Sequence, residues 1–172
     1  MPSFEDLPFL RGVSEKYDLR NPSVQVMRMD RKPKDSSPRF HAIADAWFAR
    51  KFGVNFRSQS LHLTARILTA QTHGATPAHV MRVVPLSPYR YCWSPNAVDL
   101  LFAAKKMEHS SEGEIASHLE SLNYQTDGLD AAFDSGNEVM LHCERYMAIP
   151  LHLLDGDFLS KSDESVILIN TV

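Results

Sequence analysis

The sequence predicts an α+β fold in a single domain spanning residues 1–172. Short segments with alternating apolar residues are spread along the chain, two longer segments have the apolar spacing of amphipathic helices, and no internal repeat or low-complexity tract interrupts them. A chain of 172 residues is long enough to bury a hydrophobic core. Apolar residues make up 44% of the chain and charged residues 23%, and both values are usual for a globular domain.

The first part of the chain predicts a lead-in, one strand and one helix. Residues 1–22 are polar and contain three prolines, so we expect an irregular N-terminal arm ahead of a core over residues 23–172. Residues 23–29 alternate apolar and polar side chains, which is typical of a strand. Residues 38–52 have a helical apolar stripe, and Gly53 can end that helix.

Residues 55–74 predict a strand followed by a short helix. Leu61 and Leu63 alternate with polar residues, which is the period-two pattern of a half-buried strand. Thr64 can cap the helix that follows, and Gly74 can close it. The segment therefore predicts a strand-to-helix corner lined with hydroxyl groups and an arginine.

The second half of the chain predicts strands and helices in succession. Ser111 and Glu114 have the spacing of a capping box, which marks a helix start. We expect the last two strands before residue 150 to pair around Glu144, with residues 151–154 extending the second of them. The expected elements are strands at 79–85 and 89–93, helices at 94–106 and 111–122, a short helical or irregular piece at 128–135, and strands at 138–143, 145–149 and 165–170.

Charge narrows the possible functions. The formal net charge is −3, which does not support a broad nucleic-acid-binding surface. A local basic cluster is nevertheless present, and it consists of Arg28, Arg31, Lys32, Lys34 and Arg39.

Cysteine content and hydropathy indicate in which cellular compartment the protein is expected. The two cysteines, Cys92 and Cys143, lie in apolar runs and predict buried thiols rather than a disulfide scaffold. No apolar run approaches the ~20 residues that a membrane helix needs, and the N-terminus lacks the apolar segment of a secretion signal. We expect a cytoplasmic protein, or an effector delivered without a conventional signal peptide, with no membrane partner.

Several common kinds of site are disfavoured. The eight histidines do not form a set of three or four ligands at a known metal-binding spacing, so we expect no metal. No phosphate-binding glycine loop or dinucleotide-fold fingerprint is present. No serine has a histidine or carboxylate at motif spacing, which disfavours a hydrolase triad.

Three segments carry the candidate chemistry. Arg28 comes at the exit of a strand, where its planar guanidinium can bind a diphosphate. Ser58, Ser60 and Thr64 offer hydroxyls that can hold a ribose or orient a carboxylate. Glu138 opens an apolar strand, and a carboxylate fixed there can stabilise the positive charge that develops on a sugar during glycosidic cleavage.

An aromatic segment forms a fourth candidate. Tyr89, Tyr91 and Trp93 follow a proline-bracketed turn, and aromatic faces there can stack on a nucleobase or a pyridine ring. Each candidate also has a purely structural interpretation: a surface arginine, turn and cap hydroxyls, an exposed strand-start glutamate and core-packed aromatic rings.

Arginine, hydroxyl strand and glutamate, in this order, resemble the R-S-E pattern of the cholera-toxin-like mono-ADP-ribosyltransferases. Residues 28–33 (RMDRKP) are similar to the R-x-D-x-R-x-P setting of that family's arginine, one residue shorter. Residues 56–60 resemble its aromatic and serine-threonine-serine element, and residues 61–64 fit the same place in a second register. Residues 136–139 (GNEV) are similar to its glutamate motif, and the resemblance covers roughly residues 24–150.

The resemblance implies an ADP-ribosyltransferase-like fold, with two packed small β-sheets flanked by helices, and NAD as co-substrate. Glu138 would be the catalytic glutamate, and Arg28 would hold the NAD diphosphate or the adjoining ribose. A hydroxyl would orient Glu138 and the ribose, and it would come from Ser58, Ser60 or Thr64. The further residues assigned to cofactor binding are Arg57, Tyr91 and Trp93.

The resemblance also bears on the acceptor. Arginine-modifying members carry E-x-E, and the first of these glutamates is replaced here by Gly136. We therefore expect an acceptor other than arginine, in a protein or a nucleic acid. Many members are bacterial toxins or phage-encoded modifiers, which implies a toxin or effector with an antitoxin or immunity protein as partner. The alternative is a non-catalytic module that keeps the same fold and binds nucleic acid or protein.

Overall fold

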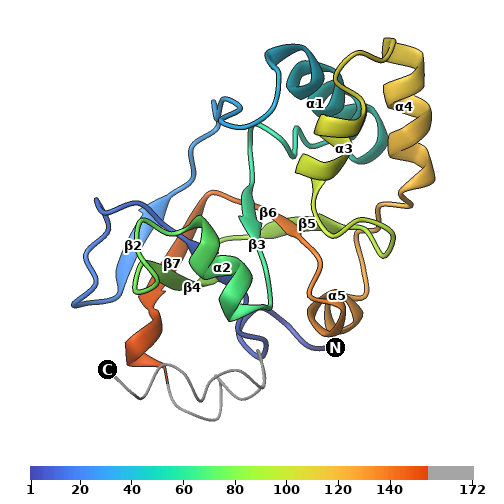
Figure 1. Cartoon of the computed structure of the whole chain (residues 1–172). Helices are drawn as coiled ribbons and strands as arrows, with labels where there is room; N and C mark the ends of the chain where they lie inside the picture. The colour runs from blue at the N-terminus through green and yellow to red at the C-terminus, as the bar shows by residue number, and fades with distance from the viewer. Residues whose placement is uncertain (155–172) are drawn as a thin grey trace.

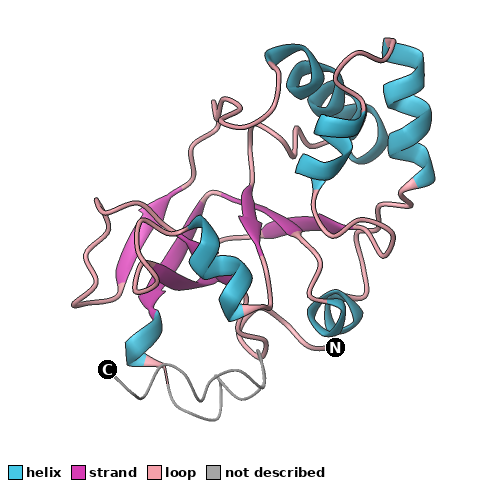
Figure 2. Cartoon of the chain, viewed as in Figure 1, coloured by secondary structure: helices cyan, strands magenta, loops and turns pink. Residues whose placement is uncertain are grey.

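The computed structural model describes residues 1–154 as two small antiparallel β-sheets with helices around them (Figure 1, Figure 2). The first sheet has the strand order β1-β4-β7-β2 and the second has the order β3-β6-β5. This confirms the α+β class and the two small sheets. The strand expected at 165–170 lies outside the described residues.

The predicted helices and strands are largely present, with shifted ends. The first sheet contains β1 (Leu10–Gly12), β2 (Ser23–Val26), β4 (Val80–Pro85) and β7 (Arg145–Pro150). The second contains β3 (Leu61–Leu63), β5 (Tyr89–Trp93) and β6 (Val139–Cys143). The helices are α1 (Pro38–Phe52), α2 (Ile67–His73), α3 (Leu100–Lys106), α4 (Glu112–Ser121), α5 (Leu129–Ser135) and the 3-10 helix η1 (Leu151–Leu153).

Local signals at helix ends agree with the structure in most places. Gly53 ends α1 in the left-handed conformation, with φ 72°. Ser111 and Glu114 form the capping box of α4, with both reciprocal hydrogen bonds present. Thr64 does not cap α2, because the N-cap position belongs to Arg66. Residues 151–154 do not extend β7, because the chain turns into η1 after Pro150.

The N-terminal segment is part of the core rather than an arm. Leu10–Gly12 forms the edge strand β1 and pairs antiparallel with β4, with Leu10 opposite Arg82. The Phe4 and Phe9 side chains are fully buried, and Arg82 donates a hydrogen bond of 2.7 Å from Nη2 to the carbonyl of Glu5. The prolines suggested irregular chain, but burial of two aromatic rings favours an ordered segment.

The two sheets are joined by backbone at two places. Leu10 and Thr64 exchange backbone hydrogen bonds of 2.8 and 2.9 Å, which link β1 to β3. At Glu144 the chain passes directly from β6 in the second sheet to β7 in the first. The hairpin expected around Glu144 is therefore wrong: β6 pairs with β3 and β5, and β7 pairs with β2 and β4. The physical reason is length, since a hairpin loop needs about two residues and this connection has one.

The second sheet separates two apolar clusters. One cluster lies between the sheets and contains residues from both, among them Leu61, Leu63, Val139, Met81 and Ala148. The other contains Met140 and Cys92 from the second sheet together with residues of α1, α3 and α4. The sheets are thus packed on each other through one face, and helices cover the other face of the second sheet (Figure 1). Both cysteines are free and buried, as predicted.

No helix within residues 1–154 is long and apolar enough to cross a membrane.

Candidate functional site

A pocket of about 570 Å³ opens where the ends of β1 and β3 meet the loop before α1 and the start of α3. Strands β1 and β3 supply Arg11 and His62, Thr64 follows β3 directly, and the loop supplies residues 31–36. The polar face of β3 and the turn before β6 supply the wall that contains Glu138. These pieces come from five separate parts of the chain, so the pocket exists only in the folded molecule.

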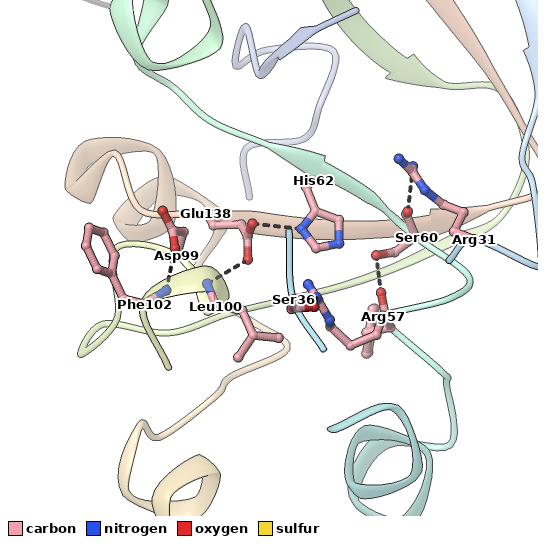
Figure 3. Close-up of polar contacts among 10 residues, drawn as sticks. Arg31, Ser36, Arg57, Ser60, His62, Asp99, Leu100, Phe102 and Glu138 are labelled. Carbon is pink, nitrogen blue, oxygen red and sulfur yellow. Dashed lines mark hydrogen bonds and ion pairs between the residues drawn. The ribbon is translucent and has the colours of Figure 1, made fainter. Parts of the chain in front are cut away.

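Glu138 is fixed in this pocket by strand register. His62 in β3 lies opposite Met140 in β6, so Glu138 is its diagonal neighbour on the same face of the sheet. The His62 Nδ1 and Glu138 Oε2 atoms lie 2.7 Å apart in a hydrogen bond (Figure 3). The backbone N–H of Leu100 donates to Glu138 Oε1 at 3.2 Å. Both carboxylate oxygens therefore have a protein partner.

The backbone of Glu138 is also held, since its N–H donates to the Val98 carbonyl at 2.8 Å. The side chain is 17% exposed. Burial raises the pKa of Glu138, but the nearby His62 and Arg57 and the Leu100 N–H outweigh burial and bring its pKa below the usual value. Glu138 is therefore a carboxylate at neutral pH.

The guanidinium groups of Arg11 and Arg31 lie in the other part of the pocket. Arg31 donates from Nη1 to the carbonyl of Ser60 at 3.0 Å, and Figure 3 places it across His62 from Glu138. Burial, with the neighbouring positive charge of Arg11, lowers the pKa of Arg31 to about 10. Among the described residues neither Arg11 nor Arg31 has a carboxylate within ion-pair distance. Two half-buried cations without an ion-pair partner favour an anionic ligand.

Arg57 approaches Glu138 from the loop after α1. Its Nη2 donates to Ser36 Oγ at 3.1 Å, and its backbone N–H donates to Asp45 Oδ1 at 3.0 Å. The Arg57 Nε and His41 Nδ1 atoms are buried without a hydrogen-bond partner. Burial, and then the charge of Arg57, lowers the pKa of His41. The surroundings of Arg57 thus disfavour further positive charge.

The structure brings three of the sequence-predicted site residues to the pocket: Glu138, Thr64 and Arg57. Thr64 Oγ1 donates to the Gly136 carbonyl at 3.3 Å and accepts from the Arg66 N–H, so it braces the turn that leads to Glu138.

The other predicted site residues do not line the pocket. The Arg28 side chain is 74% exposed and lies 3.5 Å from Asp30. Ser58 Oγ donates to Asp45, and the buried Ser60 hydroxyl donates to the Phe56 carbonyl. Tyr91 packs edge-on against Phe4. Trp93 is buried and donates from Nε1 to the Asp127 carbonyl at 2.7 Å.

Sequence reasoning did not select Arg11 or His62, although each left a signal. Arg11 follows the apolar run 8–10 and precedes Gly12, which is an unusual setting for a surface arginine. A side chain at Gly12 would meet the Ala70 carbonyl of α2 at 2.3 Å, so close packing surrounds this part of β1. His62 alternates with Leu61 and Leu63, which puts it on the same polar face of β3 as Thr64.

Within residues 1–154, no group of three or more His, Cys, Asp or Glu side chains is arranged to hold a metal ion. The chain matches no family model, no curated protein and no solved structure.

Proposed function

We propose that the protein is an NAD-dependent mono-ADP-ribosyltransferase in which Glu138 is the catalytic carboxylate. The observation that carries the proposal is that one pocket contains a negatively charged carboxylate and positively charged guanidinium groups. A carboxylate held by His62 and the Leu100 N–H lies on one side, and the unpaired guanidiniums of Arg11 and Arg31 lie on the other. A dinucleotide with an anionic diphosphate and a cationic nicotinamide-ribose end complements this arrangement.

Glu138 would act on the nicotinamide-ribose bond. Cleavage of that bond leaves an oxocarbenium-like ribose, and a preorganised carboxylate lowers the barrier by stabilising the developing positive charge. The same carboxylate can accept a hydrogen bond from the ribose 2′-hydroxyl. Nicotinamide leaves as a neutral molecule and takes the bonding electron pair, so the step needs no metal ion.

Arg11 and Arg31 take the diphosphate role in this proposal. Arg28 was expected there from the motif, but its side chain is largely exposed and lies beside Asp30. Arg11 and Arg31 both line the pocket, and guanidinium forks bind phosphate oxygens in pairs. The diphosphate would supply the counter-charge that neither side chain has within the described residues.

His62 takes the place that the resemblance gives to a serine or threonine hydroxyl. A carboxylate only accepts hydrogen bonds, so the Nδ1 atom of His62 carries the proton between them. In this role His62 is a positioning residue that orients Glu138.

The turn before Glu138 supports an acceptor other than arginine. Gly136 has φ 71°, and a Cβ at this position would lie 2.4 Å from Nε of Arg66. A second glutamate therefore does not fit two residues before Glu138, and the E-x-E arrangement of arginine-modifying enzymes is sterically disfavoured here.

Release of nicotinamide from NAD tests the proposal directly. The wild-type protein should release nicotinamide, and Glu138→Gln should reduce release by about 10²-fold or more, since one preorganised electrostatic partner contributes on this scale. Circular dichroism and thermal unfolding should show that the variant is folded. Binding of NAD without release by the wild-type protein would instead support the non-catalytic module.

A further inference from the structure

The pocket concentrates positive charge on a chain whose net charge is negative. Its lining contains five arginine and lysine side chains against three carboxylates, whereas the whole chain has a formal charge of −3. The cations are Arg11, Arg31, Lys32, Lys34 and Arg57, and the carboxylates are Asp35, Asp99 and Glu138.

Arg11 and Arg31 are assigned to the diphosphate and Arg57 acts on Glu138, which leaves Lys32 and Lys34. Lys32 and Lys34 are exposed, and they alternate with the half-buried Arg31 and Pro33 along the loop that borders the pocket. Neither lysine has an ion pair within the described residues. They form a basic rim that a second anionic molecule can contact next to a bound dinucleotide.

The opposite rim is apolar and exposed. Val98 lines the pocket and is 61% exposed. Phe102 is 66% exposed on the first turn of α3, where it does not line the pocket itself but follows the lining residue Leu101. Figure 3 shows Phe102 beside Asp99, with Glu138 between it and Arg57. A phenyl ring this exposed contributes little to the core, and exposed aromatic rings beside a basic groove are the usual stacking platforms for bases of single strands.

We propose that the acceptor is a single-stranded nucleic acid, bound with its phosphates on Lys32 and Lys34 and with a base stacked on Phe102. This inference rests on the proposed function, because it names the second substrate of the same pocket. A single strand is required because the edges of a paired base are hidden within the duplex, whereas an unpaired base can enter the pocket beside Glu138.

The bond between the ribose C1′ and the nicotinamide ring nitrogen breaks, and the electron pair leaves with nicotinamide. A nitrogen or oxygen atom of the nucleic acid forms the new bond to C1′ and loses its proton. The products are nicotinamide, the ADP-ribosylated strand and one proton, which leaves through Glu138 or solvent.

The test combines labelled NAD with mixed-sequence single-stranded oligonucleotides, the matching duplexes, or a protein lysate freed of nucleic acid. We expect label on the single strands, at least about tenfold less on the duplexes, and a steep fall of transfer with added salt. Label on lysate proteins and none on the oligonucleotides would overturn the inference.

Charge reversal separates this inference from the proposed function. Lys32→Glu with Lys34→Glu should reduce transfer to the oligonucleotide at least about tenfold, whereas nicotinamide release without acceptor, measured at saturating NAD, should fall far less. The matched control is Arg50→Glu with Arg145→Glu, which makes the same charge change on exposed residues that neither line the pocket nor share a helix with Phe102. Phe102→Ala should weaken oligonucleotide binding about tenfold, measured by fluorescence anisotropy.

The outcomes are distinguishable. Absence of nicotinamide release from NAD overturns the proposed function itself. Nicotinamide release with no labelled oligonucleotide overturns only the acceptor, as does transfer that is equal in the rim variant and in the wild-type protein.

Discussion

Glu138 and His62 are 76 positions apart in the sequence, and their Oε2 and Nδ1 atoms lie 2.7 Å apart on adjacent strands of the second sheet. The antiparallel register of β3 and β6 makes this contact, because it puts both side chains on the face that borders the pocket. The pair links the fold to the proposed chemistry, since a shift of register by one residue would put the two side chains on opposite faces of the sheet.

His62→Ala should reduce nicotinamide release about 10- to 100-fold, because a hydrogen bond to a charged group contributes roughly 1.5–3 kcal/mol. The decrease should fall mainly on kcat, since His62 orients the carboxylate rather than the diphosphate. His62→Gln should restore part of the rate, because its amide can donate to the same oxygen. Equal rates in the alanine and glutamine variants, or an unchanged rate in both, would contradict the positioning role.

Arg11→Ala should weaken NAD binding about 10- to 100-fold, because it removes charge-assisted hydrogen bonds to the diphosphate. Arg28→Ala is the matched control, since Arg28 is largely exposed and does not line the pocket. Titration calorimetry with NAD compares the two variants. A loss of affinity in Arg28→Ala and none in Arg11→Ala would indicate that Arg28, rather than Arg11, binds the diphosphate.

Gly136→Ala should destabilise the protein more than Gly53→Ala does, by about 2 kcal/mol, which is the usual scale of overpacking. Both glycines have nearly the same positive φ, 71° and 72°, so backbone strain is matched. The two positions differ in the room available for a Cβ atom. An added Cβ would lie 2.4 Å from Arg66 Nε at position 136, whereas the nearest atom to an added Cβ at position 53 is 3.5 Å away. Chemical denaturation measures both, and Arg66→Ala in the Gly136→Ala background should remove the difference.

The stability difference between the wild-type protein and Glu138→Gln should decrease as the pH falls. The folded-state pKa of Glu138 lies below its usual value, because His62, Arg57 and the Leu100 N–H outweigh the effect of burial. A carboxylate with a lowered pKa stabilises the folded state above its unfolded pKa and loses that contribution as the pH falls through the folded pKa. Denaturation of both proteins from about pH 6 to about pH 3 measures this, and a difference that grows toward acid would contradict it.

Much of the secondary structure follows from local patterns. The alternation at Leu61 and Leu63, the capping box at Ser111 and the glycine after residue 52 each mark an element that the structure contains. These signals depend on neighbouring residues, so the sequence alone carries them. Glu138 could be selected for the same reason, since a carboxylate at the start of an apolar strand is visible locally.

The partners of Glu138 were decided by tertiary structure. His62 reaches it through strand register, Leu100 through the approach of α3, and Arg57 through the loop after α1. A local pattern does not show which arginine faces the pocket. It favoured Arg28 because residues 28–33 resemble the arginine motif of the ADP-ribosyltransferases. Arg11 enters the pocket because Phe4 and Phe9 bury the N-terminal segment and make β1 an edge strand of the first sheet. The sequence by itself determined the elements and the carboxylate, whereas long-range burial and pairing decided which cations surround it, since such contacts join residues that no local pattern relates.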